Sequence, residues 1–185
     1  MLKPGMTKSE IEQFLKGKGD YVQIDHLGRF MKEPGLAMDT KKFIYLKLAE
    51  LYEKAKMFSE AAKMCDHAAD LSIPYAEKMG HYKREAELYA RAGEFDRSEM
   101  AMKKAMSEVN YREKEEIYNS MKDFYKEQGK MYEKMEKRNQ AVKFYEKVLE
   151  MRISDAERSE IKARLMELYK KLGKIREYSA MERSP

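Results

Sequence analysis

Residues 45–61 read YLKLAELYEKAKMFSEA, and the pattern of this stretch decides the fold. Tyr45 and Tyr52 lie seven residues apart, and the small residue Ala61 follows nine residues after the second tyrosine. Spacing by seven keeps both rings on one face of an α-helix, which turns once per ~3.6 residues. The stretch therefore predicts a helix with an aromatic face, followed by a second helix that presents small residues to it.

The same pattern returns along the chain. The tyrosine pair recurs at Tyr82 and Tyr89 and at Tyr125 and Tyr132, and Tyr169 marks a fourth copy, at successive spacings of 37, 43 and 37 residues. Small residues nine and sixteen positions after the second tyrosine are Ala61, Ser98, Ala141, Ala68 and Ala105, with Val148 at the last place in copy three. Each copy predicts two antiparallel helices. One such hairpin cannot bury its apolar faces alone, so neighbours must stack.

These copies resemble the tetratricopeptide repeat over roughly residues 41–182. The matching residues are Tyr45, Leu48, Ala49, Tyr52, Phe58, Ala61 and Ala68 in copy one, Tyr82, Ala86, Tyr89, Gly93, Phe95 and Ala105 in copy two, Tyr125, Gly129, Tyr132, Ala141 and Tyr145 in copy three, and Leu165, Tyr169 and Gly173 in copy four. The resemblance implies an all-α, right-handed α-solenoid of about ten antiparallel helices. Spacings of 37 and 43 residues exceed the usual ~34, which indicates longer helices or connections.

The chain before the repeats predicts a pair of short helices. Thr7-Lys8-Ser9-Glu10 is a capping-box sequence, and Gly17-Lys18-Gly19-Asp20 separates the two helices. We expect residues 1–36 to form a capping hairpin and residues 37–185 to form one continuous repeat array, with Asp39 as the N-cap of its first helix. Residues 9–32 also fit a helix-turn-helix, but Asp25 would repel phosphate, so the capping hairpin is favoured.

Composition argues against several classes of protein. The 185 residues contain no run of about 18 apolar residues and no visible secretory signal, so no membrane association and a cytoplasmic location are expected. Cys65 is the single cysteine and occupies a core position of copy one, and the three histidines lack metal-ligand spacing. No phosphate-binding glycine loop is present either. We therefore expect no catalytic residues, no metal, no cofactor and no enzymatic activity.

Two other residue types invite interpretation. Met57, Met64, Met79, Met100, Met102 and Met106 are expected mainly to fill the core, although methionine also suits adaptable binding surfaces. The heptad Tyr111, Tyr118, Tyr125 and Tyr132 favours core packing, with self-association as a homodimer as the alternative. The 43-residue spacing predicts additional helix in this part of the chain.

Positive charge is concentrated in the C-terminal part. Of the net charge of +5, residues 1–110 contribute one unit. Basic residues recur at every fourth position in a ridge formed by Lys122, Lys126, Lys130, Lys134 and Arg138, all expected on one helix. Asp123, Glu127 and Glu133 could neutralise part of this ridge locally, which would make it an ordinary solvated face.

We expect a non-enzymatic scaffold or adaptor that binds a peptide or helix of a protein partner in a concave groove. The alternative is a ribosome- or RNA-associated regulatory factor that binds phosphates through its basic C-terminal half. Leu46 and Glu50 replace the lysine and asparagine with which some tetratricopeptide proteins hold chaperone tails, so that activity is not expected. The candidate partner-binding residues are Lys83, Arg84, Lys122, Lys126, Lys130, Lys134, Arg138, Lys170, Lys171 and Lys174.

Overall fold

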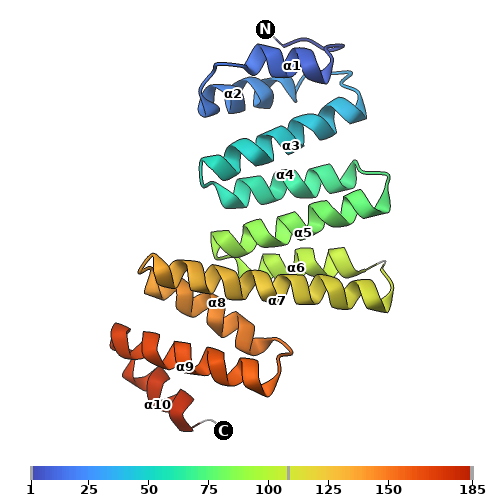
Figure 1. The fold of residues 1–185 in the computed structure, drawn as a ribbon. Coiled ribbons are helices and arrows are strands. Elements are labelled where there is room, and N and C mark those ends of the chain that lie inside the picture. The colour runs from blue at the N-terminus through green and yellow to red at the C-terminus, as the bar shows by residue number, and fades with distance from the viewer. Residues whose placement is uncertain (1, 108, 184–185) are drawn as a thin grey trace. The chain divides into compact units, whose positions relative to one another are not determined.

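The computed structural model describes residues 2–107 and 109–183. Within these ranges the chain forms ten α-helices and no strand, which confirms the all-α prediction (Figure 1). The helices are α1 (Lys8–Leu15), α2 (Asp20–Phe30), α3 (Met38–Lys54), α4 (Phe58–Asp70), α5 (Tyr75–Ala92), α6 (Phe95–Met106), α7 (Tyr111–Lys134), α8 (Arg138–Glu150), α9 (Asp155–Leu172) and α10 (Ile175–Arg183). They divide into two compact units, Met1–Ile117 and Tyr118–Pro185, and the boundary falls inside α7.

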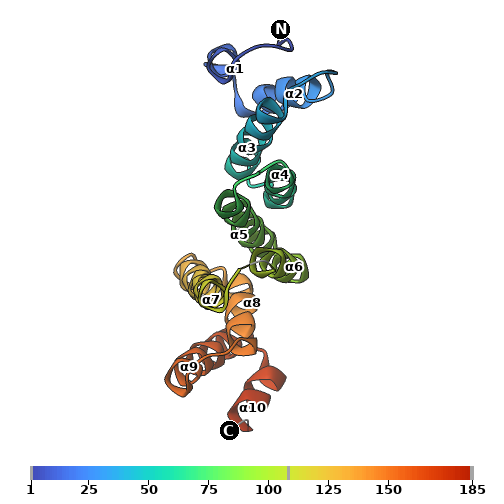
Figure 2. The same cartoon turned by 90° about the vertical axis from the view of Figure 1, so that its right-hand side faces the viewer.

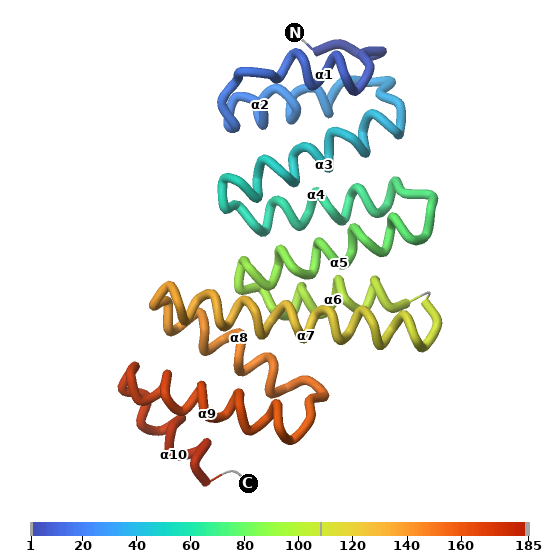
Figure 3. The backbone as a smooth tube through the Cα atoms, in the orientation of Figure 1, coloured from blue at the N-terminus to red at the C-terminus, as the bar shows by residue number. Residues whose placement is uncertain are grey.

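The first unit is built from consecutive helices that pack in pairs. Each of α3 to α6 runs back along the helix before it, as the chain path in Figure 3 shows. In the turned view, α3 and α5 lie in one layer and α4 and α6 in the other (Figure 2). The N-terminal pair covers α3, because Ile11 of α1 and Leu27 of α2 share a buried cluster with Leu48 of α3.

Several helix ends follow local sequence signals. Thr7 caps α1 in the predicted capping box, and Ser154 caps α9 in the same way. Gly93 and Gly173 end α5 and α9 with left-handed backbone, at φ of 81° and 69°. The expectation for Asp39 is wrong: it lies in the first turn of α3, after the N-cap Ala37, where its negative charge still faces the positive end of the helix.

The predicted small residues form the helix–helix contacts. Ala61, Ser98, Ala141, Ala68, Ala105 and Val148 are all fully buried. In the second unit α7 and α8 approach each other closely, because a Cβ atom placed on Gly129 of α7 would lie 2.6 Å from Cε1 of Tyr145 of α8. Only glycine fits there without displacing the aromatic ring.

The helices repeat over a longer distance than the tyrosines do. One repeat of the helices covers one 37-residue and one 43-residue spacing of the tyrosines. The starts of α4, α5 and α6 at residues 58, 75 and 95 recur as the starts of α8, α9 and α10 at residues 138, 155 and 175. Even the strained turns correspond, because Lys56 and Glu136 both have positive φ, of 60° and 56°. The α3–α6 and α7–α10 segments are therefore two copies of one four-helix repeat. Each copy can therefore be compared with the other. Residues at the same place in the two copies, such as Lys56 and Glu136, are called counterparts.

The additional helix expected from the longer spacing is present in α7. This helix has 24 residues and α3 has 17, and the extra part is residues 111–117. Ile117 packs against the cluster of Ala69, Tyr82 and Ala105 in the first unit. Core packing holds for Tyr125, whereas Tyr111 is exposed, so the tyrosine heptad is not one continuous buried seam.

The methionines divide into two groups. Met64 and Met79 pack against the buried clusters, as expected. The core prediction for Met100 is wrong, because its position on α6 leaves it 61% exposed. In the described part of the chain, no helix is long and apolar enough to cross a membrane.

Candidate functional site

The predicted basic ridge does not lie on a single helix. Lys134 is the last residue of α7, and the chain turns through Glu136, with φ of 56°, before α8 begins at Arg138. Arg138 is therefore separated from the other four cations by a helix–helix turn. The fourfold spacing alone did not reveal that turn, because the turn contains no proline or glycine.

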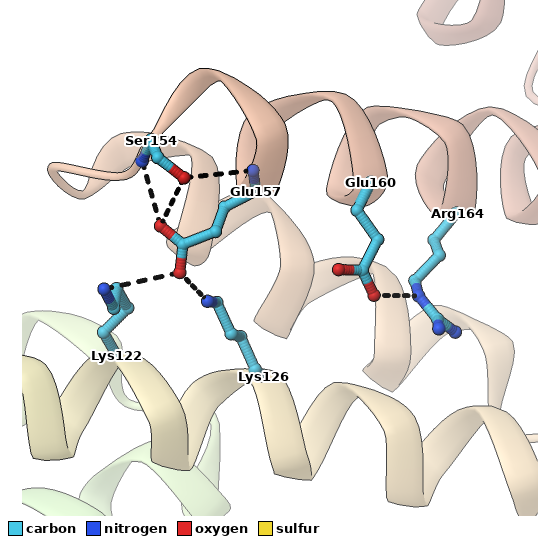
Figure 4. Close-up of polar contacts among 6 residues, drawn as sticks. All are labelled: Lys122, Lys126, Ser154, Glu157, Glu160 and Arg164. Atoms are coloured by element: carbon cyan, nitrogen blue, oxygen red, sulfur yellow. Dashed lines mark hydrogen bonds and ion pairs between the residues drawn. The ribbon is translucent and has the colours of Figure 1, made fainter.

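Two of the ridge lysines are committed to a carboxylate of the same unit. Lys122 and Lys126 of α7 both point at Glu157 of α9 (Figure 4). The Lys122 Nζ atom lies 3.4 Å from Oε1 of Glu157, and the two lysine side chains are only 15% and 18% exposed. The hydrogen bond from Lys126 and the backbone amide of Ser154 hold the pKa of Glu157 down at about 2. The charges of Lys122 and Lys126 are thus neutralised by a residue of α9. The sequence suggested Asp123 as a partner for Lys126, and that prediction is wrong.

One of these ion pairs occurs in both copies of the four-helix repeat. Lys42 of α3 contacts Glu77 of α5 at 3.0 Å, and these two residues are the counterparts of Lys122 and Glu157. This correspondence indicates that such pairs tie alternate helices together.

A second set of pairs shows the same correspondence. Arg84 of α5 contacts Glu53 of α3, and their counterparts are Arg164 and Glu133, whose atoms lie 3.3 Å apart. Glu133 also accepts a hydrogen bond from the buried Tyr145 hydroxyl at 2.8 Å. Arg84 is therefore a bridging residue between helices, and its neighbour Lys83 is half-buried on α5.

The remaining predicted cations are distributed over the second unit. Lys130 and Lys134 are exposed on α7. Lys171 contacts Glu167 on its own helix at 2.5 Å. Lys170 and Lys174 come together at the turn between α9 and α10, where they line a 220 Å³ pocket.

A larger pocket of 410 Å³ lies between α5 and α6 in the first unit. Its lining combines aromatic, thioether and basic side chains: Tyr75, Lys78, Met79, Tyr82, Met100, Lys103, Lys104 and Ser107. The Nζ atoms of Lys78 and Lys104 lie 5.8 Å and 5.4 Å from the centre of the Tyr82 ring. No carboxylate lines this pocket in the described residues. We call it the α5–α6 pocket.

A cluster of charges adjoins the α5–α6 pocket through Lys104, and only its Glu85 is buried. Lys104 contacts Asp66 of α4 at 2.7 Å and Glu85 of α5 at 3.4 Å. Glu85 is 3% exposed, and among the described residues its Oε2 atom has no hydrogen-bond partner. Burial, reinforced by the charge of Asp66, raises the pKa of the Glu85 carboxyl to about 7, although Lys104 acts in the opposite direction. The counterpart of Glu85 in the second unit is Leu165, which is fully buried. The charged cluster is thus not needed for the four-helix repeat to fold.

The residues of the α5–α6 pocket were not among the predicted site residues. One signal was available, because Tyr82, Glu85 and Tyr89 follow the 3-and-4 spacing of a buried helix face and place a carboxylate in it. A glutamate at such a position is seldom fully buried without a partner. The pairing of Lys104 with that glutamate depends on how α5 and α6 pack, which no local pattern contains.

A 550 Å³ hollow between the N-terminal helices and α3 is lined by lysines and glutamates together, so it favours neither sign of ligand charge. In the described residues, no group of three or more His, Cys, Asp or Glu side chains could hold a metal ion. The chain matches no known protein family, no curated protein and no solved structure.

Proposed function

We propose that this chain is a non-enzymatic scaffold of tetratricopeptide-like hairpins, stacked as a right-handed solenoid, that binds a protein partner at the α5–α6 pocket. The observation that carries the proposal is the lining of this pocket, in which two tyrosines and two methionines adjoin three lysines. Aromatic and methionine side chains are enriched in the cores of protein interfaces, and thioethers repack readily around different apolar partners.

The ion pairs made by two lysines of the basic ridge also favour a protein partner over RNA. Lys122 and Lys126 already bind Glu157, so an RNA phosphate would have to compete with a carboxylate held in place by a helix cap. Each phosphate contact adds affinity only if the cation is available to release counterions from the nucleic acid. Four of the five predicted ridge residues lie on α7, and two of those four are used within the chain.

An RNA- or ribosome-binding function is the second candidate. It is favoured by the exposed Lys130 and Lys134 and by the excess positive charge after residue 110. Phosphate binding through these residues would weaken steeply as salt increases, whereas binding through an apolar pocket would not.

Affinity capture from an extract of the native cell, with and without nuclease, tests the two candidates. The wild type is compared with Met100→Glu, which puts a charge into the pocket, and with Met135→Glu, a control at another exposed methionine. We expect a protein that survives nuclease, is lost with Met100→Glu and is retained with Met135→Glu. Material that disappears with nuclease and does not respond to Met100→Glu would overturn the proposal in favour of RNA.

A further inference from the structure

We infer that the α5–α6 pocket binds an acidic segment of a protein partner, with one apolar side chain inserted into the pocket and flanking carboxylates on the lysines at its rim. This inference rests on the proposed function and specifies the chemistry of the partner. It is carried by the charge of the lining, the apolar surface inside it and the contrast with the second unit.

The sign of the lining charge selects an acidic ligand. Three lysines and no carboxylate line the pocket in the described residues. Lys104 is already paired with Asp66 and Glu85 of the same unit, at 2.7 Å and 3.4 Å. Lys78 of α5 and Lys103 of α6 therefore supply the net positive charge, one from each helix. Carboxylates on either side of an inserted side chain would complement this arrangement.

The interior of the pocket selects an apolar side chain. Met79 and Tyr82 of α5 line the cavity together with Met100 of α6. Since Met100 is 61% exposed, binding would remove its side chain from water and add hydrophobic free energy to the electrostatic attraction. A cavity of 410 Å³ lies at the lower end of the range for ligand pockets, which suits one large side chain.

Much of the lining consists of side chains with several rotatable bonds, which favours a protein segment over a free organic anion. Sites for small molecules hold their ligands with a few rigidly placed polar groups. Here the polar groups are long lysine side chains, and the apolar contacts come from methionines, which adapt their shape. A protein segment can gain additional affinity from contacts beyond the pocket.

The second unit shows that a hairpin of this kind folds without such a lining. The counterparts of Tyr75, Met79, Tyr82 and Met100 there are Asp155, Ser159, Lys162 and Ala180. These four positions therefore provide no aromatic or thioether surface, and yet α9 and α10 pack against each other. The lining of the α5–α6 pocket is therefore chemically distinct from what packing requires.

Fluorescence anisotropy with defined peptides tests the inference on the full chain. The probe is a labelled peptide with one leucine flanked on each side by glutamates, and the comparison peptides replace the glutamates by glutamine or the leucine by glycine. We expect each replacement to weaken binding about tenfold, because each removes one half of the complementarity. Equal binding of the glutamine peptide would overturn the acidic recognition.

Variants locate the site. Lys103→Glu should weaken binding of the glutamate peptide about tenfold, and Met100→Ala should weaken it severalfold. The matched control is Arg183→Glu, at the counterpart of Lys103 in the second unit, and it should bind as the wild type does. Circular dichroism checks that all variants keep their helices. If Lys103→Glu and Arg183→Glu behave alike, the assignment to this pocket is wrong.

Failure of this inference can be told apart from failure of the proposed function. If Met100→Glu abolishes capture of the native protein partner while the glutamate peptide binds no better than the glutamine peptide, the pocket binds protein but does not select acid. If Met100→Glu affects neither capture nor peptide binding, both proposals are wrong.

Discussion

Replacing Glu85 by leucine should stabilise the first unit and remove part of the pH dependence of its stability. Glu85 is 3% exposed, and its Oε2 atom lacks a hydrogen-bond partner among the described residues. The second unit has Leu165 at the corresponding position, fully buried in an equivalent helix. Leucine is therefore compatible with this backbone, and the substitution exchanges a poorly solvated carboxyl for an apolar side chain.

The magnitude follows from the raised pKa. The pKa of Glu85 is about 7 in the folded chain and 4.5 in the unfolded chain, because burial disfavours the carboxylate. Between these two values the folded chain keeps a proton that the unfolded chain has released, so the free energy of unfolding falls as the pH rises. A difference of about 2.5 pKa units corresponds to about 3 kcal/mol, fully lost above pH 7.

The assay is urea unfolding, followed by far-ultraviolet circular dichroism at a series of pH values from about 4 to about 8. The quantity of interest is the difference in free energy of unfolding between Glu85→Leu and the wild type. Asp66 and Asp70 of α4 and Lys104 of α6 all act on Glu85 and are retained in both proteins, so the difference between the two proteins reports the removal of the Glu85 carboxyl. Hydrogen exchange of the α5 amides restricts the measurement to the first unit.

The expected result is a stability advantage of the variant that grows by about 3 kcal/mol from pH 4.5 to just above pH 7. Glu127→Gln, at an exposed position of α7, serves as the control and should show no such growth. If the advantage of Glu85→Leu were the same at every pH, Glu85 would not be a buried carboxyl with a raised pKa, and the reasoning would be refuted.

Three further predictions concern packing, the ion pairs and the thiol. Gly129→Ala should lower the free energy of unfolding by about 1–3 kcal/mol, because the new Cβ would lie 2.6 Å from the Tyr145 ring. The control Gly80→Ala should raise the free energy of unfolding by about 0.5–1 kcal/mol, because nothing lies within 4 Å of its new Cβ. Equal effects of the two substitutions would contradict the close approach at Gly129. Glu157→Gln should cost about 1 kcal/mol at neutral pH, and because the pKa of Glu157 is lowered to about 2, this cost should fade as the pH drops from 4.5 towards 2 in acid titrations of stability. Burial raises the pKa of Cys65 to about 12, so maleimide should label the native chain only as fast as the first unit opens, and rapid labelling would show that the thiol is accessible.

Local sequence signals predicted much of the fold. The capping box at Thr7, the left-handed glycines Gly93 and Gly173 and the buried small residues such as Ala61 are all present as expected. Each of these features depends on residues within one hairpin. The cap expected at Asp39 lies at Ala37 instead, since the helix begins there without a side-chain hydrogen bond.

The candidate site was harder to predict. Lys122 and Lys126 stood out because their spacing places them on one face, but their partner Glu157 lies on α9, beyond the whole of α8. Lys103 and Lys104 have no conspicuous periodicity, and the helical spacing of Met100 predicts a core position because it resembles that of buried methionines. Distinguishing a lining residue from a core residue requires knowing which face of α6 the neighbouring helices cover.

The sequence by itself determined that this chain is helical, that its helices pair as hairpins and that tyrosines and small residues make the contacts within each pair. These properties follow from helical periodicity and side-chain size, which act over a few turns of one helix. Tertiary structure decided which charges are neutralised. Glu157 neutralises two lysines of the ridge, and Glu85 and Asp66 surround Lys104, while Lys78 and Lys103 remain at the rim of a pocket. Ion pairing and burial depend on distances between helices far apart in sequence, and only the packed structure sets those distances.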